Sequence, residues 1–269
     1  MRRLAVVGVD SSVGSAIMVH FDGTAEVSGV RLAQQSAVGD LCDRCTDIVV
    51  CGDASLSSWD DGFGDLKSDC RLVPEYCQWA ERAGSRLVYI SSDAIFGGPW
   101  VFHDDDSSKF FHSPIAQQLQ SIEQTVLKSD RNLVIRTNAI SDVSGSWLDR
   151  IRNSFRSRIP QRFTANQYAT PLAACRLALL LDHVLQTPAA GVVHLAGAER
   201  LSAWNFATQI ARAESVNIQC ALPSIEPEPR EQSLRCTRAR NELRLRMPTL
   251  SQTIAELTTT AVTGSRQAA

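Results

Sequence analysis

The sequence predicts an α/β fold built on a parallel sheet, and three observations lead to this prediction. Continuous apolar runs, such as LAVVGV at 4–9 and DIVVCGDA at 47–54, are typical of strands covered on both faces. Stretches with the 3.6-residue spacing of helices lie between these runs. Apolar residues make up 44% of the 269 residues and charged residues 21%, the balance of an ordinary globular protein.

Each element is expected from its own local signals. Strands are expected at 4–9, 23–32, 47–54, 86–93, 132–139 and 191–197, and helices at 10–21, 68–83, 113–129, 171–186 and 202–215. Pro114 suits the first turn of its helix, whereas Pro74 must lie early in its helix or kink it. Ser202 is placed to cap the last of these helices.

Charge and composition exclude several classes of function. A net charge of −2 and a pI near 6.2 give no basic surface for nucleic acid. No apolar run reaches the ~20 residues of a membrane-spanning helix. The short apolar run at the N-terminus leads straight into a glycine turn, so we expect a cytoplasmic protein. Eight cysteines are scattered along the chain and only Cys42 and Cys45 form a CxxC pair, so we expect free thiols and no metal site.

A glycine turn follows the first expected strand. Dinucleotide-binding folds need glycine there because the backbone approaches a pyrophosphate at a helix N-terminus. The segment 8–14 reads GVDSSVG, so Gly8 and Gly14 fit a GxxGxxG spacing and Ser11 replaces the middle glycine. Ser12 and Val13 then begin the helix. The pattern leaves two interpretations, a dinucleotide site or a turn that has lost its ligand.

The second expected strand, at 23–32, ends near Arg31. An arginine at this place can pair with the 2′-phosphate of NADP, whereas an acidic residue would favour NAD. Arg31 is otherwise a solvated surface arginine. NADP is therefore favoured over NAD only if a dinucleotide binds.

Six ordered motifs resemble the extended short-chain dehydrogenase/reductase superfamily. The motifs are DIVVCGDA, SSDAIFGG, NLVIRTNAI, NQYATPLAACRLALLL, GVVHLAGAERLSAWNFA and PREQSLRCTRARNEL. They are most similar to the dTDP-4-dehydrorhamnose reductase group, which also includes the regulatory β subunit of methionine adenosyltransferase. The resemblance covers the chain from Leu4 to about Leu257.

The resemblance implies a Rossmann-like, doubly wound parallel sheet with a small C-terminal lobe. We expect residues 1–165 to form the dinucleotide-binding core. Residues 166–269 would add a helix and a strand to this core and form a small lobe over the cleft. The resemblance further implies NADP or NAD as cofactor and a nucleotide or nucleotide sugar as ligand. Cys51, Gly52, Asp53 and Ser91 would line the cofactor.

The family's catalytic groups are only partly present. Ser92 falls on the threonine that hydrogen-bonds the reacting oxygen, and Asp93 follows it. The resemblance implies a tyrosine and, four residues later, a lysine on the next helix, where this sequence has Ile115 and Leu119. Anchoring the alignment on Pro114 instead gives Gln118 and Ile122. Neither alignment supplies the proton donor or the cation that lowers its pKa.

Two functions compete on this basis. In the first, the chain has lost redox chemistry and acts as a nucleotide-binding or regulatory protein, with a protein partner or as a homodimer. In the second, it remains an NAD(P)-dependent reductase, or another enzyme on a nucleotide-linked substrate, with Ser92, Asp93 or water as proton donor.

Other polar residues suggest alternatives. Ser92 and Asp93 lie within a short span of His103, His112 and the acidic run at 104–106, so a hydrolytic triad is one alternative, and the DDD run could bind Mg²⁺. Arg136 and Arg230 are candidates for binding a phosphate or carboxylate, and His194 is expected to be structural.

Overall fold

The central element is a six-stranded parallel sheet. The structure is a computed structural model and describes residues 3–32 and 45–264. The strands are β1 (Arg3–Val7), β2 (Glu26–Val30), β3 (Asp47–Val50), β4 (Arg86–Ser92), β5 (Leu133–Thr137) and β10 (Gly191–His194). They lie in the order β10-β5-β4-β3-β1-β2. The order reverses at β1 and β3, which is the arrangement of a doubly wound sheet and confirms the predicted fold class.

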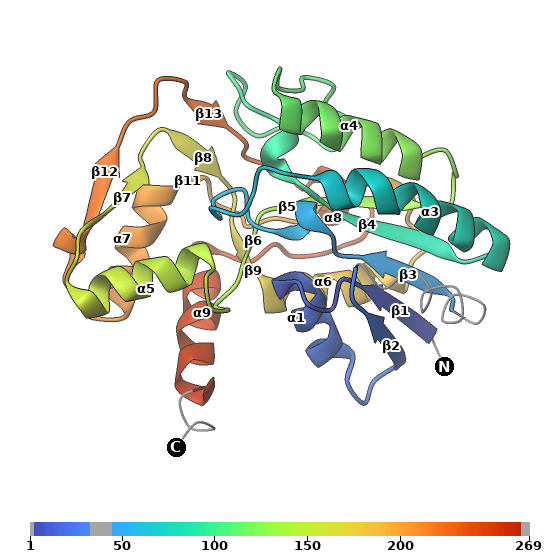
Figure 1. The fold of residues 1–269 in the computed structure, drawn as a ribbon, viewed down its shortest axis with the longest axis horizontal. Coiled ribbons are helices and arrows are strands. Elements are labelled where there is room, and N and C mark those ends of the chain that lie inside the picture. The colour runs from blue at the N-terminus through green and yellow to red at the C-terminus, as the bar shows by residue number, and fades with distance from the viewer. Residues whose placement is uncertain (1–2, 33–44, 265–269) are drawn as a thin grey trace.

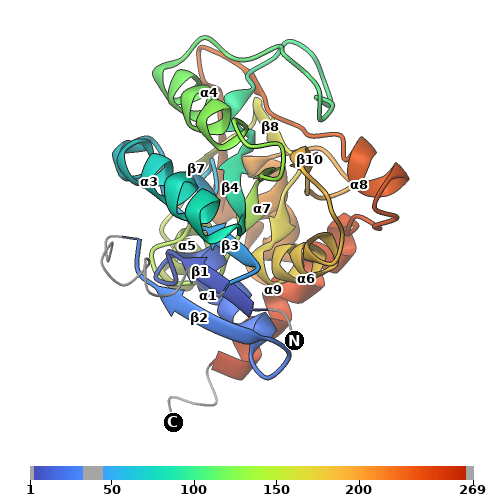
Figure 2. The same cartoon turned by 90° about the vertical axis from the view of Figure 1, so that its right-hand side faces the viewer.

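Helices cover both faces of this sheet. α1 (Ser12–Phe21) and α6 (Ala174–Leu185) pack together on one face, and α3 (Lys67–Ala83) and α4 (Pro114–Val126) on the other (Figure 2). Because both faces are covered, β3 and β5 are buried along their whole length, which explains their unbroken apolar sequence.

A second hydrophobic core lies beside the sheet (Figure 1). It is built from α5 (Trp147–Ser157), β7 (Gln161–Thr164), α7 (Ala203–Ala213), β12 (Ala221–Ser224) and part of α9 (Leu250–Gly264). β7 pairs with β12. α5 and β7 thus belong to this lobe although they precede the boundary expected at 165. The lobe begins earlier in the chain than the sequence indicates.

Short elements connect the lobe to the sheet. β6 (Ala139–Ile140) pairs with β9 (Leu172–Ala173). β8 (Gln167–Ala169) pairs with β11 (Leu201–Ser202) and β13 (Arg230–Glu231). Three 3₁₀ turns, η1 (Asp53–Ser55), η2 (Asp93–Ile95) and η3 (Ile218–Cys220), and the short helix α8 (Thr237–Asn241) complete the described chain.

The local predictions have mixed outcomes. Ser202 caps α7 by accepting a hydrogen bond from the Asn205 amide, and Pro114 lies in the first turn of α4, both as predicted. Pro74 lies in the interior of α3, which excludes the early position, one of the two alternatives that the sequence left open. No helix within the described residues is long and apolar enough to cross a membrane.

Candidate functional site

The turn between β1 and α1 is shaped by its two glycines. Gly8 has φ +87°, and a Cβ there would lie 2.0 Å from the Cys51 carbonyl oxygen. A Cβ on Gly14 would lie 2.1 Å from the Gly8 carbonyl oxygen. Both distances are far below van der Waals contact, so only glycine lets α1 pack against β1 and β3 at this point.

Ser11 is the N-cap of α1. Its backbone is extended, with φ −76° and ψ 155°, and its Oγ accepts a hydrogen bond from the Gly14 amide at 2.9 Å. The amides of Ser12 and Val13 have no acceptor among the described residues. A helix N-terminus with two such amides carries a partial positive charge and suits a phosphate group. The exposed Asp10 adjoins this turn, and the exposed Arg31 directly follows β2.

The end of β3 is organised around Asp69, a fully buried carboxylate on α3. It accepts hydrogen bonds from the Asp53 amide at 2.8 Å, the Ala54 amide at 3.0 Å and the Tyr89 hydroxyl at 2.7 Å. Burial raises the pKa of Asp69 above its usual range, against the effect of these donors. A Cβ on Gly52 would lie 1.8 Å from Asp69 Oδ1, so Gly52 is required for the carboxylate to fit.

Cys51, Gly52 and Asp53, which were expected to line the cofactor, therefore have structural partners. The Cys51 side chain is buried, and burial together with the Asp69 charge raises the pKa of its thiol. Asp53 Oδ2 accepts a hydrogen bond from the Ser68 amide at 3.1 Å in the first turn of α3. Sequence analysis did not single out Asp69 as the centre of this group.

The two serines at the end of β4 point to opposite sides of the sheet. Ser91 Oγ donates to Glu123 Oε1 at 2.6 Å, beneath α4. Glu123 also forms a buried ion pair with Arg136, at 2.7 Å between Oε2 and Nη2. Ser91 thus contacts the α4 side of the core. Arg136 was a candidate for binding a ligand anion, and the structure shows that prediction to be wrong because its guanidinium is paired with Glu123.

Ser92 and Asp93 lie at the carboxyl end of β4, beside Thr137 of β5. Ser92 Oγ is 3.4 Å from Asp93 Oδ1. Burial raises the pKa of Asp93 from 3.8 to about 7, although hydrogen bonding to Ser58, Asn138 and Ser92 opposes the change. Asp93 Oδ2 and Thr137 Oγ1 are buried and have no hydrogen-bond partner in the described structure.

A loop after η1 covers these groups. Ser57 Oγ donates to Asn138 Oδ1 at 2.6 Å, and Asn138 Nδ2 donates to Ser58 Oγ at 3.2 Å. The next residue, Trp59, packs in the second core, with its ring 5.0 Å from Trp147 and 5.9 Å from Phe206. Ser92 and Asp93 have no exposed surface.

Comparison with known proteins assigns this architecture to a family. The model of the family described as RmlD substrate binding domain matches residues 65–263. The chain belongs to this family. No curated protein matches the chain.

Several solved enzyme structures have the same fold. The chain is similar to dTDP-4-dehydrorhamnose reductase from Bacillus anthracis in complex with NADP, with 16% identity, 96% of this chain and 99% of that chain covered, and a TM-score of 0.83. The dTDP-4-dehydrorhamnose reductase of Clostridium acetobutylicum is 16% identical, with 96% of this chain and 99% of that chain covered and a TM-score of 0.80. The Bordetella bronchiseptica enzyme WbmH in complex with NAD⁺ is 15% identical, with 95% of this chain and 96% of that chain covered and a TM-score of 0.76.

The helix expected to carry the RmlD-family tyrosine and lysine is α4. Its sequence is PIAQQLQSIEQTV, with neither residue. Leu119 is fully buried in the core and Ile115 packs partly buried against it. The polar inward group of α4 is Glu123.

The alternative polar sites have other partners. His103 stacks on Phe96, with ring centres 4.0 Å apart, and no hydrogen bond joins a described histidine to Ser92. Asp105 accepts from the amides of His194 and Arg238. His194 is buried as predicted, and burial beside Arg136 lowers its pKa to about 3. The triad is therefore not assembled among the described residues.

Metal and disulfide chemistry find little support in the described part of the chain. No group of three His, Cys, Asp or Glu residues there could hold a metal ion. Cys51, Cys70, Cys77, Cys175, Cys220 and Cys236 are free thiols. Cys42 of the CxxC pair lies outside the described residues.

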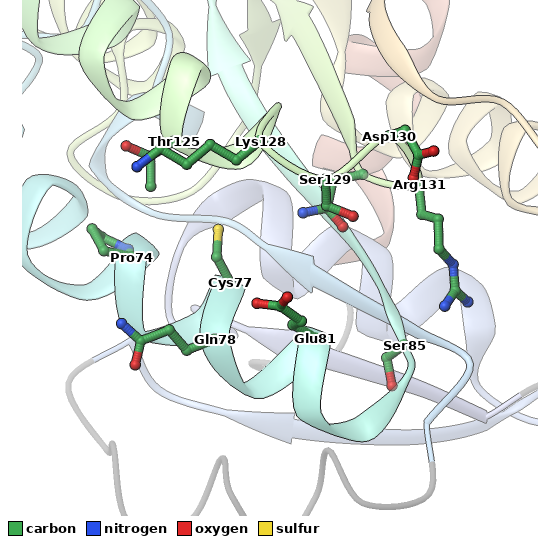
Figure 3. Close-up of a pocket in the computed structure, with 11 residues that line it drawn as sticks. Pro74, Cys77, Gln78, Glu81, Ser85, Thr125, Lys128, Ser129, Asp130 and Arg131 are labelled. Atoms are coloured by element: carbon green, nitrogen blue, oxygen red, sulfur yellow. The ribbon is translucent and has the colours of Figure 1, made fainter.

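A polar groove of about 570 Å³ lies away from these groups, between α3 and the α4–β5 connection (Figure 3). Cys77 and Glu81 face Lys128 and Ser129 across it. Burial raises the pKa of Cys77 to about 11, so its thiol is protonated. None of the residues expected in the cofactor or catalytic site lines this groove.

Proposed function

We propose that this RmlD-family chain binds NADP or NAD through its adenosine and pyrophosphate portion and has lost the family's Tyr/Lys reduction. Its role would be binding or regulation. The observation that carries the proposal is the complete burial of Ser92 and Asp93, with Ser58 of the Ser57–Asp60 loop hydrogen-bonded to Asp93.

The phosphate part of a dinucleotide fits the residues present. The amides of Ser12 and Val13 would donate to the pyrophosphate, and the Ser11 hydroxyl keeps its proton for a further bond. Arg31 stands at the end of β2, where it would meet the adenosine ribose or its 2′-phosphate. The nicotinamide part does not fit, because Ser92 and Asp93 at the expected reaction site have no accessible surface.

The proposal predicts that the nicotinamide adds nothing to affinity. Calorimetric titration should give dissociation constants for NADP and for 2′-phospho-ADP-ribose that agree within about threefold. Binding of NADP more than tenfold tighter than that of 2′-phospho-ADP-ribose would contradict the covered site. Oxidation of NADPH in the presence of a dTDP-4-keto sugar would also contradict the covered site.

The variant Ser12→Pro tests the phosphate contact directly. Proline is tolerated at the first helical position, and the extended backbone of Ser11 suits a residue before proline. The variant removes one amide donor and keeps the helix, so NADP affinity should fall about tenfold, the usual order for a lost charge-assisted hydrogen bond. Ser12→Ala, which keeps the amide, is the matched control and should bind as the parent does.

One observation favours a second candidate, an active reductase. A pKa of about 7 suits Asp93 to donate a proton at neutral pH, and Ser92 Oγ lies beside it. Turnover would require the Trp59 loop to open. NADPH oxidation that disappears in Asp93→Asn and rises in Trp59→Ala would establish this candidate in place of the first.

A regulatory role would require a protein partner or a second copy, and we propose a cytoplasmic setting for it. Mixing purified protein with an enzyme that it copurifies with should change that enzyme's rate. An unchanged rate at saturating concentrations would leave nucleotide binding as the whole function.

A further inference from the structure

The chain between η1 and α3 extends from the sheet towards the second core and forms no helix or strand (Figure 1). We call residues 57–61 of this connection the lid segment. On its sheet side, Ser57 and Ser58 are hydrogen-bonded to Asn138, at 2.6 and 3.2 Å. Ser58 is also hydrogen-bonded to Asp93. No backbone hydrogen bond joins the lid segment to β4 or β5 in the described structure, so side chains alone hold it there.

The other side of the lid segment is attached to α5. Asp60 Oδ1 accepts a hydrogen bond from the Trp147 amide in the first turn of this helix, at 2.5 Å. Arg150 of the same helix donates to the Trp59 carbonyl oxygen at 3.0 Å and forms an ion pair with Asp61 at 2.5 Å. The lid segment therefore bridges the carboxyl end of the sheet and the second core.

This closed arrangement leaves polar atoms without partners. Trp59 Nε1, Arg150 Nε, Asp93 Oδ2 and Thr137 Oγ1 are buried and have no hydrogen bond in the described structure. Thr137 is the register partner of Ser92 on the neighbouring strand. A buried polar atom without a partner has lost the hydrogen bond that it makes to water when exposed. Access of water to these atoms would remove that penalty, so it favours opening.

Both ends of the lid segment are suited to act as hinges. Upstream, η1 is fixed because Asp69 accepts hydrogen bonds from two of its amides. Downstream, a Cβ added to Gly64 would meet no atom within 4 Å, and one added to Gly62 would meet only Leu56 Cδ1, at 3.9 Å. The chain can change direction at these glycines without displacing a neighbour, as a hinge requires.

From these observations we propose that the lid segment opens as a unit about Leu56 and the stretch 62–64. Opening would expose Ser92 and Asp93 at the end of β4, and Thr137 beside them, to solvent. The closed form keeps ligands away from these three side chains. The inference does not rest on the proposed nucleotide binding, because no contact of the lid segment described above involves the β1–α1 turn.

The charge surroundings of Asp93 couple this opening to pH. The charged side chains on the elements around it have other partners: Asp53 and Asp69 accept from backbone amides, and the ion pairs are Arg150–Asp61 and Glu123–Arg136. His103, on the loop after η2, stacks on Phe96, and burial lowers its pKa. Asp93 has no ion pair in the described structure, and burial raises its pKa to about 7.

The direction of the pH effect follows from this burial. An exposed Asp93 would ionise near its ordinary pKa of 3.8, whereas the closed form holds the proton up to about pH 7. The closed form is therefore favoured at low pH, and the open fraction rises about tenfold per pH unit between about pH 4 and 7 and then levels off. Asp60 of the lid segment acts in the same direction, because burial also raises its pKa.

The test is amide hydrogen exchange of the full chain without added nucleotide, followed by mass spectrometry and expressed as protection factors. Residues 57–61 and 92–96 should open together, with protection factors at least tenfold lower than those of 133–136 in β5. Their protection should fall about 100-fold from pH 4.5 to pH 7.5. Urea at 1 M should lower the protection of 133–136 but hardly that of 57–61, because a local opening exposes little surface.

Two variants with matched controls test the mechanism. Asp93→Asn, which cannot ionise, should lose most of the pH dependence, and the exposed Asp130, changed to asparagine, should keep it. Ser57→Ala removes a bond to Asn138 and should speed exchange at 92–96 about tenfold at pH 6. Ser121→Ala, at an exposed position of α4, should leave this rate unchanged.

Three results would overturn the inference. Exchange at 57–61 and 92–96 no faster than at 133–136 would mean that this region opens only by global unfolding. An unchanged rate at 92–96 in Ser57→Ala would mean that the lid segment does not close the end of β4. A full pH dependence in Asp93→Asn would remove Asp93 as the group that couples opening to pH.

Discussion

Replacing Asp93 by asparagine should remove a pH-dependent loss of stability. Burial raises the pKa of Asp93 from its ordinary value of 3.8 to about 7. The unfolded chain therefore releases this proton at lower pH than the folded chain. Stability is fully present below about pH 4 and is lost as the pH rises towards 7. Since a tenfold change in an ionisation equilibrium is worth about 1.4 kcal/mol, the total loss is about 4 kcal/mol.

The measurement is urea unfolding of the parent and of Asp93→Asn at pH 4.5, 6 and 8. Asparagine has nearly the shape of the protonated acid, so the variant should be more stable by only about 1 kcal/mol at pH 4.5, where the unfolded chain has begun to release the proton. The variant should be more stable by about 4 kcal/mol at pH 8. The exposed Asp106, changed to asparagine, is the control and should shift stability by less than about 0.5 kcal/mol at each pH. Parallel pH profiles for the parent and Asp93→Asn would refute the assigned burial and charge state.

Three other changes test the packing around the site. Gly52→Ala should lower the free energy of urea unfolding by about 2–4 kcal/mol, because the added methyl clashes with the Asp69 carboxylate. In an Asp69→Ala background the same change should lower it by under about 1 kcal/mol. If the two substitutions were additive, the contact would be excluded. Glu123→Gln should lower the free energy of unfolding by about 3–5 kcal/mol, because it leaves the Arg136 charge buried without its partner. The double variant Glu123→Leu/Arg136→Met, which removes both charges, should lose less stability than this single variant. Trp59→Ala should cost about 3 kcal/mol and speed amide hydrogen exchange at 92–96; unchanged exchange would mean that Trp59 does not close the site.

The sheet was largely predictable from sequence, because burial on both faces leaves a continuous apolar run in its central strands. Five of the six strands lie within the expected ranges, and β1 begins one residue earlier than expected, at Arg3. The helices α1, α3, α4, α6 and α7 followed from spacing and from cap or proline signals, whereas α5, α8 and α9 were not predicted. The lobe boundary was not predictable, since α5 and β7 join β12 and α7 through contacts between residues far apart in the chain. Nothing in the local sequence of α5 says which core it enters.

In the candidate site, the local sequence predicts the orientation of some side chains but not their partners. The helical spacing of Asp69 with Leu72, Val73 and Tyr76 could have placed its carboxylate inward, but its partners at Gly52 and Tyr89 come from other elements. The two-residue period of a strand likewise separates Ser91 from Ser92, yet only the fold shows Ser91 bound to Glu123. Trp59 lies in a loop without periodicity, and its packing on Trp147 is a tertiary contact that no sequence pattern indicates.

The energetics of the Trp59 loop argue for binding over turnover. If exposing Ser92 requires removing Trp59 from its core contacts, the cost is about 3–5 kcal/mol, by analogy with large-to-small substitutions in cores. An opening cost of about 3 kcal/mol leaves the open form below roughly 1% of the population. A substrate that needs Ser92 would then bind at least ~100-fold more weakly than its contacts alone would allow. A ligand held at the Ser12 and Val13 amides pays no such cost. The fold is therefore better suited to hold the phosphates of the proposed dinucleotide than to bring its nicotinamide ring to Ser92.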